Sequence, residues 1–265
     1  LSGLVGSEMC IRDSPYFSHA ETEARLLDFN HAMLELRKRA GTGTPPYDSI
    51  NTREFAVAGY DLGAQTVQAL LGEKIKGIQR PETAQDIRAA ILLSPHVDVA
   101  GGGIQHRFRE IHTPLLVITG THDQDPWGMT SPSVRMAPWQ QAGSSRKVLL
   151  TLTQATHRQM AGHDPAALEA EDHEKDPEEM SVREDPEENP MKDAIRQMGG
   201  SGQAPSRRGP RPQSDPRHPG QQLSAIQWIS AAFLAETLNQ DRASATWLRN
   251  KAAHWLSGAG VLQNR

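Results

Sequence analysis

The 265-residue chain is nearly balanced in charge, with 28 Lys and Arg against 32 Asp and Glu and a formal net charge of −4. A nucleic-acid-binding domain is expected to carry a clear basic excess, so no nucleic-acid partner is expected. Hydrophobic residues make up 37% of the chain and the mean hydropathy is −0.58, so part of the chain is expected to lie outside a packed core. No apolar stretch approaches the length of a membrane span.

Residues 1–14 do not read as part of a protein domain. Met-Cys-Ile-Arg-Asp at 9–13, followed by Ser14, resembles the translation of the mosaic end of a transposase-based sequencing adapter, ATG TGT ATA AGA GAC AG. The resemblance implies an adapter artefact over 1–14, with the true N-terminal part of the gene upstream of the printed sequence. The only cysteine, Cys10, lies inside this segment, so cysteine usage gives no information about the redox compartment. A signal peptide would have been lost with the N-terminus, so localisation stays unassigned.

Residues 15–163 show the pattern of an α/β layer. A helix is predicted over 21–40, where apolar residues recur at helical spacing among charged ones. Continuous apolar runs then predict strands that are buried on both faces of a parallel sheet. These strands span 54–58, 88–95, 112–120 and 146–152, the last of them nearer an edge of the sheet. The fold class expected is therefore α/β, with a mostly parallel sheet flanked by helices.

The composition changes abruptly over 164–220. Acidic tracts at 169–176 and 184–188 are followed by a proline-rich and arginine-rich tract at 205–212. Such a sequence cannot bury enough apolar surface to offset the entropy of ordering it, so we interpret it as a disordered, charged insertion. Apolar residues at helical spacing return over 221–265 and predict the closing helices of the same domain.

The most informative stretch spans residues 55–71. An apolar strand passes through Gly59-Tyr60-Asp61-Leu62-Gly63 into a predicted helix. Glycines on both sides of the turn let strand and helix approach closely, while the central residue takes a strained conformation and projects over the end of the sheet. With these residues the chain resembles the α/β-hydrolase family, in which this turn is the nucleophile elbow. The resemblance implies that Asp61 takes the nucleophile position, where serine is the commoner residue.

Two further features follow from that resemblance. The runs at 233–238 and 252–256 look like the closing helices of uncapped hydrolases related to dienelactone hydrolase and platelet-activating-factor acetylhydrolase. The chain is then the C-terminal part of an α/β-hydrolase fold whose N-terminal strands are missing from the printed sequence. Those strands would pair with the strand before Asp61, and without them this strand is an exposed edge.

The remaining catalytic candidates follow two later strands. Asp123 comes just after the strand at 112–120, where the family carries the acid of its triad, and Asp125 is the alternative. His157 comes after the last predicted strand, where the family carries its base. Nucleophile, acid and histidine thus occur in the family's order. The acid would orient the imidazole and stabilise its charged form, and the histidine would activate the nucleophile or a water molecule.

An aspartate at this turn leaves three functions open. The first is hydrolysis of ester-like small molecules through the triad, because the uncapped layout is similar to such hydrolases, and the other two are alternatives to it. A carboxylate attacking an ester would form a high-energy anhydride, however, and is better suited to displacement at saturated carbon, as in the haloalkane dehalogenases and epoxide hydrolases that Gly-x-Asp-x-Gly resembles. Those enzymes usually have Trp where this chain has Leu62, and a helical cap for which 95–113 is too short. The third possibility is a catalytically silent binding domain.

Only one of the two expected oxyanion-hole donors can be assigned to a residue of this sequence. The backbone N–H of Leu62 would supply one donor, but the second normally comes from a loop after an early strand, which here lies upstream of the adapter junction. We therefore expect the printed chain to be poorly soluble or inactive.

Other polar and aromatic residues gave weaker signals. His122, His163 and Asp164 lack the spacing of a metal site, so no metal and no cofactor is expected. His96 and His106 flank a glycine-rich loop that either borders the site or is a simple turn. Trp127, Met129 and Trp139 either line a substrate cleft or pack in the core.

Overall fold

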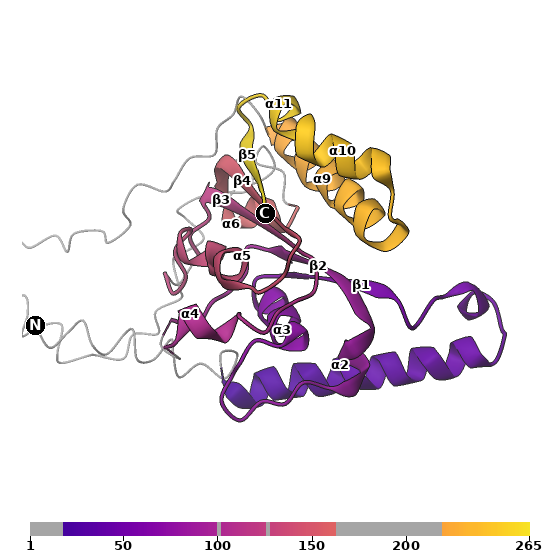
Figure 1. The fold of residues 1–265 in the computed structure, drawn as a ribbon. Helices are drawn as coiled ribbons and strands as arrows, with labels where there is room; N and C mark the ends of the chain where they lie inside the picture. Colours follow the sequence, from indigo (N-terminus) through magenta and orange to yellow (C-terminus); the bar gives the residue numbers. More distant parts are fainter. Residues whose placement is uncertain (1–17, 100–101, 126–127, 163–218) are drawn as a thin grey trace, which may run out of the picture.

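The computed structural model describes residues 18–99, 102–125, 128–162 and 219–265 (Figure 1). The proposed adapter segment at 1–14 lies outside these residues. Of the proposed insertion at 164–220, the described part includes only its last two residues, which belong to a helix.

A five-stranded sheet forms the centre of the fold, with its strands in the order β1-β2-β3-β4-β5. Neighbouring strands from β1 to β4 are parallel, and β5 is antiparallel to β4. The strands are β1 (Phe55–Tyr60), β2 (Ile87–Leu93), β3 (Leu115–His122), β4 (Lys147–Thr156) and β5 (Gly260–Asn264). The expected fold class, α/β with a mostly parallel sheet flanked by helices, is confirmed.

Helices cover both faces of the sheet (Figure 1). On one face the apolar core includes residues of α2, α3 and α5, and on the other it includes residues of α9, α10 and α11. The α-helices are α2 (His19–Gly41), α3 (Leu62–Leu71), α4 (Ile104–Arg107), α5 (Ala137–Gln141), α6 (His157–Met160), α9 (Pro219–Asn239), α10 (Arg242–Asn250) and α11 (Ala252–Trp255). Short 3₁₀ turns are η2 (Tyr47–Ser49), η3 (Glu82–Asp86) and η4 (Val134–Met136).

The central strand β3 shows why its sequence is apolar at consecutive positions. Successive side chains of a strand point to opposite faces, so Leu115 and Val117 pack with α3 and α5 while Leu116 and Ile118 pack with α9. All four side chains are fully buried. A strand that is covered on both faces therefore reads as one continuous hydrophobic run.

The ends of several elements differ from the prediction. The strand expected at 112–120 begins at Leu115, directly after Pro114, which has no N–H to donate to a sheet, and it continues to His122. The last parallel strand extends to Thr156 rather than 152. The segment 221–265 contains helices and also a strand that was not expected, because Gly260–Asn264 pairs with β4 at the edge of the sheet. The few residues of this strand carry little local signal, and a partner more than a hundred residues away stabilises them.

The two longest described helices, α2 and α9, lie on opposite faces of the sheet. Neither these nor any other helix in the described part of the chain has an apolar stretch that would cross a bilayer.

Candidate active site

Asp61 occupies the single residue between β1 and α3. Its backbone has φ 51° and ψ −113°, a combination that is strained for any residue with a side chain. A Cβ on Gly59 would lie 2.4 Å from the carbonyl carbon and oxygen of Gly63, so only glycine fits at this position. A Cβ on Gly63 would meet no atom within 4 Å. The expectation that the turn needs both glycines is therefore wrong. The strand and the helix come closest where Gly59 meets the backbone of Gly63, and a side chain at position 63 would have room.

His157 is fixed at the end of β4, where α6 begins. The Thr156 side chain accepts from the backbone N–H of Gln159, and the Gln159 side chain accepts from the backbone N–H of Thr156. The hydroxyl of Tyr60 donates to the backbone carbonyl of His157 at 3.1 Å, and the two rings are 4.9 Å apart. Burial raises the pKa of Tyr60, with a further contribution from the Asp61 charge, so this hydroxyl keeps its proton. Tyr60, the residue before Asp61, thus helps to fix the position of His157 through a hydrogen bond and a ring contact.

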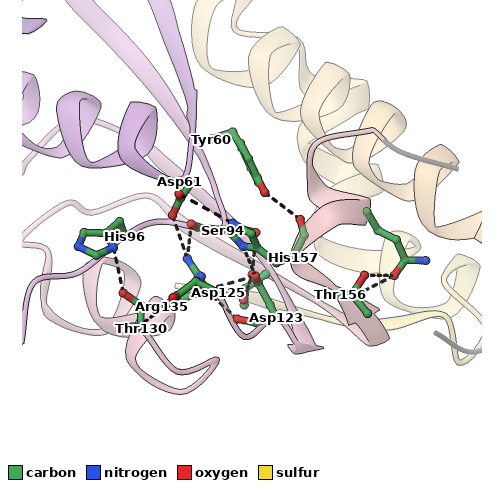
Figure 2. Close-up of polar contacts among 12 residues, drawn as sticks. Tyr60, Asp61, Ser94, His96, Asp123, Asp125, Thr130, Arg135, Thr156 and His157 are labelled. Atoms are coloured by element: carbon green, nitrogen blue, oxygen red, sulfur yellow. Dashed lines mark hydrogen bonds and ion pairs between the residues drawn. The ribbon is translucent and has the colours of Figure 1, made fainter. Parts of the chain in front are cut away.

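The structure brings Asp61, Asp123 and His157 together (Figure 2). Nδ1 of His157 lies 2.8 Å from Oδ1 of Asp123, and Nε2 lies 3.8 Å from Oδ2 of Asp61. The exposed fraction of the side chain rises from 0% for Asp123 to 9% for His157 and 18% for Asp61. Asp61 is therefore the member of the three that solvent reaches most readily.

Asp123 is held as a buried carboxylate. Its Oδ2 accepts hydrogen bonds from Ser94 Oγ at 2.7 Å and Thr119 Oγ1 at 2.8 Å. Burial by itself would raise the pKa of Asp123, but the hydrogen bond from His157, the charge of Arg135 and the two hydroxyls together hold that pKa below its ordinary value. Because a carboxylate only accepts hydrogen bonds, Nδ1 of His157 donates the proton in this contact, and Nε2 is the ring nitrogen that faces Asp61.

Arg135 occupies the centre of this site, although no pattern in the surrounding sequence predicted it. It is fully buried in the turn η4. Its Nε donates to the backbone carbonyl of Asp123 at 2.8 Å and lies 3.2 Å from Oδ1 of the same residue. Its Nη1 donates to the carbonyls of Ser94 and Pro95 and lies 3.7 Å from Oδ1 of Asp61. One buried guanidinium thus contacts both carboxylates that face His157.

Ser94 and Thr119 were also missed. Ser94 follows β2 and has a positive φ of 45°, so that a second strained residue lies beside Asp61. Thr119 is an inward-facing residue of β3 and is 1% exposed. Neither hydroxyl has a sequence pattern that separates it from other serines and threonines, and only the assembled sheet brings both to Asp123.

Asp125, the alternative acid, has another set of partners. Its carboxylate accepts from the backbone N–H groups of Met129 and Thr130, and Oδ2 lies 3.9 Å from Nη2 of Arg135. It therefore shapes the turn after β3, whereas Asp123 is the carboxylate that meets Nδ1 of His157.

His96 borders the same site. Its Nδ1 lies 3.1 Å from Thr130 Oγ1, and its backbone N–H donates to the carbonyl of Asp61 at 3.3 Å. Burial lowers the pKa of His96, which is 3% exposed. His106, by contrast, is an exposed residue of α4.

The remaining candidates have other positions or are outside the described residues. Leu62 begins α3, so its backbone N–H is one of the first-turn donors without a partner inside the helix. Trp139 belongs to the apolar core, and Met129 is half-buried. Trp127, His163 and Asp164 lie outside the described residues. Among the residues that the structure describes, no group of three or more His, Cys, Asp and Glu is arranged to hold a metal ion.

Comparison with known proteins gives a limited result. No family model and no curated protein matches the chain. Among solved structures, it is similar to a crystal structure of a puromycin hydrolase mutant complexed with PGG, with 17% identity over 55% of this chain and a TM-score of 0.34. The match covers 24% of the puromycin hydrolase chain, so this chain spans about a quarter of that protein's length. A likeness at this level carries no conclusion about activity, and the class established for this chain is that of an α/β fold.

Proposed function

We propose that the chain belongs to the α/β-hydrolases and is a hydrolase in which Asp61 is the nucleophile, His157 the base and Asp123 the acid that orients it. The observation that carries the proposal is the strained Asp61 between β1 and α3, with Nε2 of His157 3.8 Å from its Oδ2 and Asp123 on the far side of the imidazole. The exposed fractions of the three side chains support these roles, because the residue that contacts the substrate has to be the most accessible, and Asp61 is the most exposed of the three.

The chemistry of a carboxylate favours an alkyl substrate. Oδ2 of Asp61 would attack a saturated carbon, expel a halide or open an epoxide, and form an alkyl ester. The alkoxide formed from an epoxide would take a proton from water. Water, giving a proton to Nε2 of His157, would then attack the ester carbon Cγ. The alcohol leaves with the proton returned by His157, and the new carboxyl group of Asp61 loses its proton to solvent. The same carboxylate attacking an ester would give an anhydride, which makes alkyl halides and epoxides the better substrate class.

Hydrolysis of ester-like small molecules is a second candidate, and one observation favours it. In the described residues between β2 and β3, which exclude 100–101, the only helix is the four-residue α4. A capped site would have a larger helical insertion at this position. In this case His157 would take a proton from a water molecule that Asp61 positions, this water would attack the ester carbonyl, and the alcohol would leave with the proton returned by His157, so no covalent intermediate would form.

Isotope labelling distinguishes these functions. We would incubate the protein with styrene oxide, butyl bromide or p-nitrophenyl acetate in water enriched in oxygen-18 and analyse the peptide that contains Asp61 by mass spectrometry. An Asp61 nucleophile takes up the heavy isotope when the ester is hydrolysed. Release of p-nitrophenol without label in Asp61 would favour ester hydrolysis by activated water.

A trapping variant gives a second, independent readout. His157→Gln should form the alkyl ester but hydrolyse it slowly, so the adduct accumulates on Asp61. His106→Gln, which alters an exposed histidine of α4, is the matched control and should behave like the unmodified chain. Absence of label, adduct and turnover with all three probes would overturn the proposed hydrolase and leave a binding domain.

A further inference from the structure

Two buried polar atoms in the site lack a hydrogen-bond partner and lie on neighbouring groups. They are Oδ1 of Asp61 and Nη2 of Arg135. The same Oδ1 lies 3.7 Å from Nη1 of Arg135, close enough for an ion pair but too far for a hydrogen bond. Nη2 also has only an ion pair, at 3.9 Å from Oδ2 of Asp125. Buried charged atoms without hydrogen bonds are uncommon in folded proteins, so a role in the reaction is a physical reason for their position at the proposed nucleophile.

The guanidinium has little freedom to move. Arg135 is fully buried, and its Nε and Nη1 donate to the backbone carbonyls of Asp123, Ser94 and Pro95. These three acceptors belong to the segments that follow β2 and β3. The positive charge is therefore fixed by the backbone before any substrate arrives, which is what makes electrostatic stabilisation effective in an enzyme.

The two oxygens of Asp61 have different surroundings. Oδ1 is buried on the side of Arg135, whereas Oδ2 faces Nε2 of His157. Oδ2 is consequently the oxygen that can attack a substrate carbon, and in the resulting ester Oδ1 is the carbonyl oxygen. When water attacks Cγ, the electron pair of that carbonyl bond moves onto Oδ1, and Oδ1 becomes an oxyanion 3.7 Å from Nη1 of Arg135.

We propose that Arg135 stabilises the oxyanion that forms on Oδ1 of Asp61 during hydrolysis of the covalent ester. This inference rests on the proposed function of Asp61 as nucleophile. The backbone N–H of Leu62 would supply only one donor to this oxyanion, and Arg135 would supply a positive charge in addition. This role also gives Arg135 opposite effects on the two steps: ester formation removes the negative charge next to the guanidinium, whereas attack by water restores it.

That asymmetry defines the test. With styrene oxide or butyl bromide, ester formation and ester hydrolysis are followed by rapid quenching and intact-protein mass spectrometry. Arg135→Gln should hydrolyse the ester about 10²-fold more slowly, the usual cost of losing an oxyanion donor, with formation of the ester unchanged or faster. The adduct should therefore accumulate. A merely structural Arg135 would instead slow both steps together and overturn the inference.

Because Arg135 is buried, Arg135→Gln is compared with a charge-preserving variant. Arg135→Lys keeps a cation and should recover hydrolysis relative to Arg135→Gln, as judged on folded samples with a cooperative thermal transition. If Arg135→Gln does not fold, the neutral Arg135→Met is measured in its place, and hydrolysis of its ester at the unmodified rate would overturn the inference. Arg158→Gln, at an exposed arginine of α6, is the control and should leave both steps unchanged.

The two proposals fail in distinguishable ways. If His157→Gln accumulates an Asp61 adduct while Arg135→Gln hydrolyses its ester at the normal rate, only the role of Arg135 is wrong. If no variant forms an adduct and Asp61 takes up no oxygen-18, the nucleophile itself is wrong.

Discussion

The two carboxylates on either side of His157 have contrasting surroundings. Asp123 is fully buried and accepts hydrogen bonds from Ser94, Thr119 and His157. Asp61 is partly exposed, has a strained backbone, and keeps Oδ1 without a hydrogen bond. A carboxylate that only orients its neighbour gains from having every lone pair occupied. A carboxylate that must form a bond has to be accessible to substrate, and the greater exposure of Asp61, whose Oδ2 faces His157, is the physical basis for assigning the two roles.

Replacing Asp61 should separate activity from stability. Asp61→Asn removes the proposed nucleophile, and we expect turnover of the alkyl probes to fall by at least about 10³-fold. The free energy of unfolding should change less than in Asp123→Asn, because Oδ1 makes no hydrogen bond and Arg135 keeps Asp123 and Asp125 as ion-pair partners. Turnover and urea unfolding, measured on the same preparation, check both parts. A variant that keeps its turnover would remove Asp61 from the mechanism.

Replacing Asp123 should reduce both quantities. Asp123→Asn presents an NH₂ group to two hydroxyls, the imidazole and Arg135, and takes a negative charge from a buried ion pair. Loss of one partner of such a pair typically costs about 4 kcal/mol of unfolding free energy. Urea denaturation of this variant beside Asp61→Asn tests the contrast directly: equal stability of the two variants would contradict it.

The turn itself supplies a matched pair of variants. Gly59→Ala would place a Cβ 2.4 Å from the backbone of Gly63, and we expect a loss of about 3 kcal/mol in unfolding free energy, since backbone atoms cannot move aside. Gly63→Ala adds its Cβ in open space and should be close to neutral. Thermal and urea unfolding compare the two. Similar losses in both would show that the close approach at Gly59 is not what the turn depends on.

The buried carboxylate also predicts a pH dependence. The pKa of Asp123 is held below its ordinary value of 3.8, so its contribution to stability is complete above that value and is lost as the pH falls through the lower pKa of the folded state. Unfolding free energies measured at successively lower pH should fall more steeply for the unmodified chain than for Asp123→Asn, which has no proton to bind. Parallel curves would mean that other carboxylates determine the acid sensitivity.

The sequence predicted the fold class because the signals involved are local. Consecutive apolar residues in β2 and β3 show that both faces of these strands are covered, and Gly59, Asp61 and Gly63 predict a turn between strand and helix. Parallel strands also bring their carboxyl ends to one edge, which is why Asp61, Asp123 and His157 could be considered together.

Arg135 could not be predicted in the same way. Arginine is usually exposed, and nothing in the residues around η4 distinguishes one that is fully buried. Its position depends on carbonyl groups in the segments after β2 and β3, and the spacing of residues in the sequence does not predict such contacts. The strand β5 was missed for the same reason, since its pairing with β4 is non-local.

Replacement of Tyr60 should have the smallest effect. It tests how much the Tyr60 hydroxyl contributes to the position of His157 relative to Asp61. Tyr60→Phe keeps the ring 4.9 Å from the imidazole but removes the hydroxyl that donates to the carbonyl of His157. We expect a loss of about 1 kcal/mol in unfolding free energy, the usual net value of one hydrogen bond, and a severalfold decrease in turnover because His157 becomes less well fixed relative to Asp61. Tyr47→Phe, in the exposed turn η2, is the control for loss of a tyrosine hydroxyl. If Tyr60→Phe matched this control in both stability and turnover, the Tyr60 hydroxyl would have no role in positioning His157. The hydrogen bond from Nδ1 to Asp123 would then be sufficient to hold the imidazole next to Asp61.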